Sequence, residues 1–219
     1  LVCAYDISFS DVPESSWFYE DVMTLSESGV VSGYPDGTYR PTKKGTTGES
    51  LKMILLAAGY PEPERVDSHW ARGYLNFAID QGFLVRYQDI SDLDVNMTRG
   101  LLAKLAANAL GLSDPGTYGT FTDTDSVYVE ALYAAGIVGG YPDGTYRPDA
   151  SVSRAEIAAI VNRIYQSLDP VIPTDPDQDP AEITLRTTEQ MIDFIKCFII
   201  IALGHKFRKM IQCSILLVQ

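Results

Sequence analysis

The sequence predicts a mainly α-helical protein built from three tandem helix–loop–helix repeats with short irregular or β-like loops. Three observations predict this fold class. The nine residues 33–41 recur letter for letter at 140–148, so the chain contains a duplication. A weaker third copy lies between them, since residues 70–82 match residues 17–29. In each copy, apolar residues at helical spacing stand on both sides of an irregular loop.

Glycines that would end the first helix of each copy fall at near-equal intervals, at Gly29, Gly82 and Gly136. A unit of this size has a marginal core by itself, so we expect the three units to pack on one another. The intervals predict three repeats, at residues 5–60, 61–115 and 116–168. After them, the composition indicates an acidic proline-rich linker at 169–180 and an apolar tail at 181–219.

The first repeat shows the expected order of elements. Val22 and Leu25 follow helical spacing, and Gly29 stands where a helix C-cap belongs. Residues 34–37 have turn chemistry, because a proline presets φ and a glycine closes the turn. A second helix is expected over residues 51–58, and the third repeat follows the same pattern.

The second helices share a start signal. Thr46 with Glu49, and Ser153 with Glu156, have the spacing of a capping box, in which hydroxyl and carboxylate bind each other's backbone N–H. The second repeat keeps the cap at Thr98 and lacks the glutamate. These caps explain Glu49 and Glu156 completely, so we interpret both as structural residues rather than catalytic ones.

Composition narrows the class of function. With 46% hydrophobic and 21% charged residues, the chain has globular composition and is not wholly disordered. The formal net charge is −12, from 17 Lys and Arg against 29 Asp and Glu. Because nucleic acids are bound mainly through phosphate neutralisation, this charge argues against a nucleic-acid partner and against docking on an anionic membrane surface.

Metal and disulfide chemistry is not expected in the repeats. Cysteines occur only at Cys3, Cys197 and Cys213, so the repeats hold neither a disulfide framework nor a thiolate zinc site. His69 and His205 lie far apart, with no second ligand at metal spacing. We therefore expect no metal and no cofactor.

The two ends of the chain are less informative. The first residue is Leu rather than Met, which indicates a fragment or a processed chain, and residues 1–4 could be the stub of an export signal. In the tail, the apolar stretches 198–203 and 215–218 are interrupted by basic residues. No run approaches the about 20 residues of a membrane span. A packed helix, an interfacial segment and an aberrant end all fit the tail.

The repeats resemble the S-layer homology (SLH) family. The resemblance rests on Phe-Ser-Asp-Val at 9–12, the nine-residue loop at 33–41 and 140–148, and Ser-Arg-Ala-Glu at 153–156. It implies three modules in a pseudo-threefold bundle with grooves between neighbours. It also implies a non-catalytic, extracellular role at the cell wall or S-layer. There the module would anchor an exported protein to a secondary cell-wall polysaccharide that is attached to peptidoglycan and carries a pyruvate ketal.

Two arginines are the leading candidates for binding such a polymer. Arg154 and Arg99 each combine a guanidinium with a helix N-terminus, and both features suit a carboxylate. The alternative is that they lie on a solvated helix start. The preceding hydroxyl residues, Ser153 and Thr98, are candidates for the same site.

Other candidates follow from the resemblance. Trp17 and Trp70 either stack on a sugar face or anchor the first helix in the core. Asp11 and Asp123 either cap the first helix or bind sugar hydroxyls. Gly33 and Gly140 lie in the repeated loop. They would allow the backbone geometry of that loop and let its N–H groups approach a ligand.

Departures from the family pattern reduce the number of expected sites. Thr47 stands where Arg154 stands in the third repeat, and the second repeat lacks the nine-residue loop. We expect one or two working grooves. Two other functions remain open: an enzyme acting on wall glycans, with Asp11 and Glu49 as acid and base, and assembly with S-layer neighbours without sugar binding.

Overall fold

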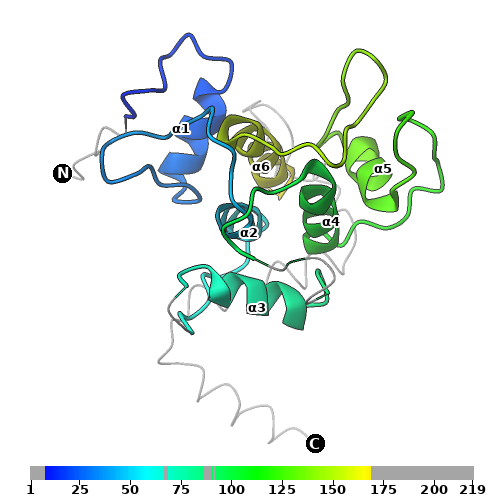
Figure 1. Cartoon of the computed structure of the whole chain (residues 1–219), viewed down its shortest axis with the longest axis horizontal. Coiled ribbons are helices and arrows are strands. Elements are labelled where there is room, and N and C mark those ends of the chain that lie inside the picture. Colours follow the sequence, from blue (N-terminus) through cyan, green and yellow to red (C-terminus); the bar gives the residue numbers. More distant parts are fainter. Residues whose placement is uncertain (1–7, 67–68, 86–89, 91, 169–219) are drawn as a thin grey trace, which may run out of the picture. The chain divides into compact units, whose positions relative to one another are not determined.

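The computed structural model describes residues 8–66, 69–85, 90 and 92–168 (Figure 1). Within these residues it is mainly α-helical and has no sheet, as predicted. The linker at 169–180, the tail at 181–219 and the possible signal stub at 1–4 lie outside the described residues. The helices are α1 (Tyr19–Glu27), α2 (Thr47–Ala57), α3 (Arg72–Asp80), α4 (Arg99–Ala109), α5 (Val127–Ala134) and α6 (Arg154–Leu168).

Local signals set where the helices begin and end. The Thr46 hydroxyl accepts from the Glu49 N–H at 3.2 Å, and the Glu49 carboxylate accepts from the Thr46 N–H at 2.8 Å. This is a complete capping box at the start of α2. After α1, α3 and α5 the chain turns through a left-handed glycine, with φ of +75° at Gly29, +75° at Gly82 and +72° at Gly136.

The helices pack in pairs that cross the sequence repeats. α3 packs on α2, α5 packs on α4, and α1 packs on α6, while α2 also contacts α4 and α6. In Figure 1, α2, α4 and α6 lie at the centre, with α1, α3 and α5 outside them. The first helix therefore closes on the last, and the Asn162 side chain donates to the Asp21 carboxylate at 2.8 Å across this contact.

The segments that precede the three central helices are joined by a ring of backbone hydrogen bonds. Gly45 donates to Val152 at 3.0 Å, Val152 donates to Met97 at 3.1 Å, and Met97 donates to Gly45 at 2.9 Å. Each predicted repeat thus contributes one donor and one acceptor. The β-like loops of the prediction are present as isolated antiparallel bridges, at Lys44–Ser153, Thr46–Asn96 and Thr98–Ser151.

Candidate functional site

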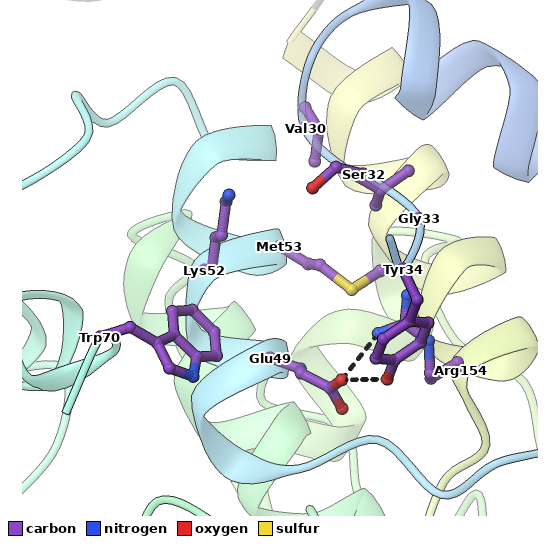
Figure 2. A pocket seen from close by; sticks show the side chains of 10 residues that line it. Val30, Ser32, Gly33, Tyr34, Glu49, Lys52, Met53, Trp70 and Arg154 are labelled. Atoms are coloured by element: carbon purple, nitrogen blue, oxygen red, sulfur yellow. Dashed lines mark hydrogen bonds and ion pairs between the residues drawn. The ribbon is translucent and has the colours of Figure 1, made fainter. Parts of the chain in front are cut away.

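A pocket of about 230 Å³ is lined by residues from all three predicted repeats (Figure 2). Tyr34 and Glu49 come from the first repeat, Trp70 from the second and Arg154 from the third. The ring of backbone bonds and the α2–α6 contact bring these distant segments together. The remaining lining residues are Val30, Val31, Ser32, Gly33, Lys52 and Met53.

Arg154, the first residue of α6, is buried, with 4% of its surface exposed. Its Nε donates to the Tyr39 carbonyl at 2.8 Å, and its Nη1 lies 3.1 Å from Oε1 of Glu49. The guanidinium also lies 4.5 Å from the Tyr39 ring and 4.9 Å from the Tyr34 ring. The alternative of a solvated helix start is therefore wrong for Arg154, because repeat-to-repeat packing covers the side chain.

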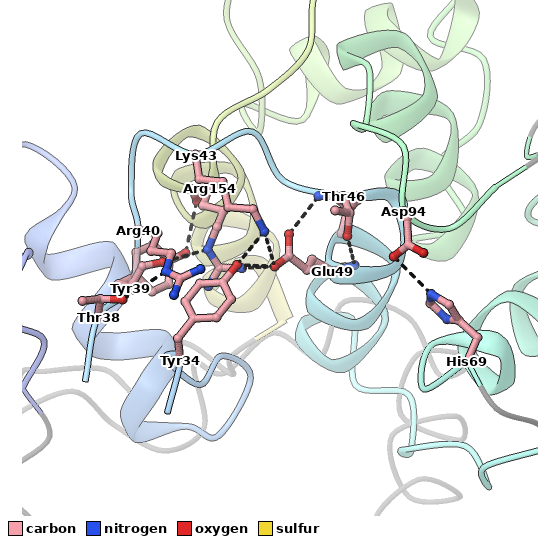
Figure 3. Close-up of polar contacts among 11 residues, drawn as sticks. Tyr34, Thr38, Tyr39, Arg40, Lys43, Thr46, Glu49, His69, Asp94 and Arg154 are labelled. Atoms are coloured by element: carbon pink, nitrogen blue, oxygen red, sulfur yellow. Dashed lines mark hydrogen bonds and ion pairs between the residues drawn. The ribbon is translucent and has the colours of Figure 1, made fainter. Parts of the chain in front are cut away.

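Glu49 joins the helix cap to the pocket, as Figure 3 shows. Its Oε2 caps α2, while its Oε1 accepts from the Tyr34 hydroxyl at 2.5 Å and lies 3.4 Å from Nζ of Lys43. Burial alone would raise the pKa of Glu49. The hydrogen bonds from Thr46 and Tyr34 and the charges of Arg154 and Lys43 outweigh burial and lower that pKa. Glu49 is thus an anion at neutral pH.

Tyr34 is a pocket residue that sequence reasoning assigned only to a turn. Its ring lies 4.0 Å from the Arg40 guanidinium and 5.2 Å from Nζ of Lys43, in addition to the contact with Arg154. Its hydroxyl accepts from Lys43 at 2.9 Å and donates to Glu49. An aromatic residue repeated at Tyr34 and Tyr141 beside a repeated arginine was the available signal.

The two tryptophans differ in position. Trp70 lines the pocket, is 40% exposed, and is stacked by the His69 ring at 6.0 Å. Trp17 is 66% exposed. Among the described aromatic rings it contacts only that of Phe18, edge to face, with the ring centroids 5.3 Å apart. Core anchoring is therefore wrong for Trp17, which lies before the first turn of α1.

Lys52 lines the pocket and was not a sequence candidate. It lies one helical turn after Glu49 on α2, so the two side chains share a face. It forms no ion pair or hydrogen bond with the described part of the chain. Its ammonium is thus available to a ligand.

A second arginine arrangement repeats part of this geometry. Arg99, the first residue of α4, is 7% exposed, and its Nε donates to the Tyr146 carbonyl at 2.7 Å. Its guanidinium lies 4.4 Å from the Tyr146 ring and 5.1 Å from the Tyr141 ring. The solvated reading is wrong here too. Unlike Glu49, Glu156 forms no ion pair with an arginine in the described structure.

The hydroxyl candidates are engaged in helix caps. Thr98 accepts from the Leu101 N–H at 3.2 Å. Ser153 accepts from the Glu156 N–H at 3.3 Å and donates to the Glu156 carboxylate at 2.6 Å. At the third equivalent position, Thr47 is buried and donates to the Val95 carbonyl at 3.1 Å. That position carries no cation.

Asp11 and Asp123 hold the repeated loops rather than a helix. Asp11 accepts from the backbone N–H of Tyr39 at 2.7 Å and of Arg40 at 2.8 Å. Asp123 makes the same pair of bonds in the third repeat. The helix-cap interpretation is therefore wrong, and α1 and α5 have no side-chain cap. The two hydrogen bonds to Asp11 hold Arg40 at a φ of +59°.

Gly33 and Gly140 are required for space rather than for an unusual backbone. Neither has a positive φ, in contrast to Gly37 in the same loop at +77°. A Cβ at Gly33 would lie 2.3 Å from the Phe9 ring and 2.8 Å from the Thr38 carbonyl oxygen. The loop's backbone geometry therefore depends on these glycines through the space that the missing side chain leaves, and not through a positive φ. The missing side chain lets the loop lie directly against an aromatic ring.

The described residues offer neither a metal site nor a membrane span. No group of three or more His, Cys, Asp or Glu side chains there has the geometry to hold a metal ion. No helix in the same part of the chain is both long enough and apolar enough to cross a membrane.

Comparisons with known proteins find one domain family and several cell-surface proteins. Residues 8–44 and 120–158 match the S-layer homology domain. The chain is 28% identical over 174 residues to a cellulosome-anchoring protein of Acetivibrio thermocellus, covering 70% of this chain and 38% of that protein. It is 28% identical over 162 residues to cell surface glycoprotein 1 of the same species, covering 61% and 7%. An S-layer protein of Bacillus licheniformis is 26% identical over 209 residues, covering 85% and 24%.

Proposed function

The chain carries S-layer homology domains at residues 8–44 and 120–158, and from this premise we propose that it is a non-catalytic cell-wall anchoring module. Its location is the cell wall or S-layer surface, as the domains and the surface-layer relatives indicate. We propose that it binds a secondary cell-wall polysaccharide without covalent attachment and tethers an exported protein. The chain spans 38% or less of the three relatives described, so the tethered part is itself a proposal.

The proposed frame is a pseudo-threefold bundle of the repeats 5–60, 61–115 and 116–168. Support comes from the ring of bonds through Gly45, Met97 and Val152, in which each repeat takes the same part. Further support comes from the pairing of each outer helix with the central helix before it, including α1 with α6. Such a frame makes grooves between repeats, and the pocket at Arg154 is one of them.

The proposed ligand group at this pocket is the carboxylate of a pyruvate ketal. The observation that carries the proposal is the local charge. Arg154 lies 3.1 Å and Lys43 lies 3.4 Å from the Glu49 carboxylate, and Lys52 lines the same pocket as Arg154, in a chain whose net charge is −12. Repulsion from distant acidic groups is screened beyond about 8 Å. A charge-assisted hydrogen bond contributes about 1.5–3 kcal/mol locally, so the local attraction outweighs the distant repulsion.

Arg154 retains capacity for an anion although it is buried. Its Nε and Nη1 are used by Tyr39 and Glu49, and no described residue accepts from Nη2. Tyr34 and Trp70 add ring faces on which a sugar can lie. The pocket therefore combines a fixed guanidinium with aromatic surfaces.

The carboxylates that a wall-glycan hydrolase would need are committed to the fold. Both oxygens of Asp11 accept backbone N–H groups, and both oxygens of Glu49 accept hydrogen bonds. Glu49 has a lowered pKa, whereas a general acid needs a raised one. These contacts support a non-catalytic role.

Co-sedimentation with purified wall sacculi tests the proposal. We expect the protein to pellet with intact sacculi and to stay in solution after the secondary polymer is chemically stripped. Arg154→Lys keeps the charge and loses the planar fork, so we expect weaker pelleting at unchanged circular dichroism. Binding that survives stripping would refute polymer anchoring.

A further inference from the structure

Each central helix has two positions at which a basic residue would lie beside a potential groove. The first is the residue that begins a central helix, occupied by Thr47 in α2, Arg99 in α4 and Arg154 in α6. The second lies five residues further along each helix, where the three repeats have different residues. Arg154 bonds to the loop of the first repeat, and Arg99 bonds to the loop of the third. Each arginine therefore lies beside the central helix of the following repeat, so the two cations of one groove come from two different helices.

The groove at Arg154 has both cations. Its second position is Lys52 on α2, which lines the pocket and has no charge partner among the described side chains. At the equivalent place beside Arg99, the second position belongs to α6 and is Ala159. At the equivalent place beside Thr47, the second position is Lys104 on α4, but the first position is not charged. The Lys104 ammonium lies 5.8 Å from the Tyr128 ring.

The charges within the Arg154 pocket leave a surplus. Arg154 and Lys52 line the pocket together with Glu49, and Lys43, which does not line it, lies 3.4 Å from the same carboxylate. Glu49 can balance one of these three cations, so two positive charges in and beside the pocket stay unbalanced. Figure 2 shows Lys52 on the Trp70 side of the pocket and Arg154 on the Tyr34 side, with Met53 between them. One carboxylate bound at Arg154 would leave the Lys52 charge unmatched.

We propose that Lys52 is a second ligand-binding residue and that this pocket takes a polymer segment with two anionic groups, one at Arg154 and one at Lys52. This rests on the proposed function, since it concerns the same polymer. The equivalent place beside Arg99, which has one cation, would take at most one anionic group. In the described part of the chain, the pocket at Arg154 is then the one selective for a doubly charged segment.

The test compares Lys52→Gln with Lys104→Gln, the same change at the same helix position outside the pocket. The probe is purified secondary cell-wall polysaccharide, titrated by calorimetry at low and at high NaCl. We expect Lys52→Gln to weaken binding by about 10-fold or more at low salt, the share of one charge-assisted hydrogen bond. The loss should shrink at high salt, and Lys104→Gln should bind like wild type.

The outcomes separate the two claims. If wild type and Lys52→Gln bind equally while Arg154→Lys is weakened, the second anionic contact is refuted and the proposed function stands. If Lys104→Gln loses as much as Lys52→Gln, the effect is one of overall charge and the proposal is likewise overturned. If the wild-type protein does not bind the polymer at all, both claims fail. Circular dichroism of each variant establishes that it is folded.

Discussion

Replacing Glu49 with glutamine isolates the charge that balances Arg154. Glutamine at this helix position still forms a capping box, so the substitution keeps the helix start and the side-chain shape. It removes the anion that lies 3.1 Å from Nη1 of Arg154 and 3.4 Å from Nζ of Lys43. Arg154, only 4% exposed, would then hold a buried charge without its ion-pair partner.

The expected cost follows from that burial. Removing one partner of a buried ion pair costs about 3–5 kcal/mol. Arg154 keeps its bond to the Tyr39 carbonyl, and the Glu49 side chain is 15% exposed, so the lower end applies. We expect Glu49→Gln to lower the free energy of unfolding by about 3 kcal/mol, or Tm by about 6–12 °C for a chain of this size.

Glu156→Gln is the matched control, since Glu156 caps α6 as Glu49 caps α2 but has no arginine ion pair in the described structure. We expect it to cost less than about 1 kcal/mol. Urea unfolding followed by circular dichroism at neutral pH measures both variants. Equal losses, or a larger loss for Glu156→Gln, would refute the assignment of Arg154 and Glu49 as a buried pair.

Three further predictions concern the frame of the site. The pKa of Asp36 is about 2, because hydrogen bonds from Thr38 and Arg40 favour its ionised form, and Glu49 is lowered likewise. The stabilising effect of Asp36 is present above its unfolded pKa of about 4 and is lost as the pH falls to about 2, and that of Glu49 is lost in the same direction, so the urea midpoint should fall as the pH falls below about 4; a constant midpoint would contradict this. Gly33→Ala forces a clash and should cost about 1–3 kcal/mol, whereas Gly139→Ala, with open space at its Cβ, should be neutral. Leu25→Ala on α1 should cost about 2–5 kcal/mol, and calorimetry should still show one transition because α1 packs on α6; separate transitions would show that the repeats fold independently.

Sequence reasoning predicted the features that depend on neighbouring residues. The capping box at Thr46 and Glu49 and the left-handed glycines at Gly29, Gly82 and Gly136 depend on contacts within a few residues, which spacing reveals. The mainly helical class follows from the same periodicity. The two capping boxes and the ends of the helices therefore needed no knowledge of tertiary packing.

The site itself depends on contacts that spacing does not reveal. The pairing of Arg154 with Glu49 and Tyr39 joins the third repeat to the first, across 115 residues in the case of Tyr39. Single-residue patterns cannot show that each helix pair crosses a repeat boundary. For the same reason Tyr34 and Lys52 were missed as pocket residues. The sequence also could not decide whether Arg99 and Arg154 are solvated or belong to a binding site.

The central claim is that the Arg154 pocket holds an anionic group of a secondary wall polymer. The most direct test is the dissociation constant of the wild-type protein for that polymer before and after its pyruvate is removed. We expect a loss of about 10- to 100-fold on removal, the share of a charge-assisted contact to one carboxylate. Equal affinity for the two polymers would contradict it.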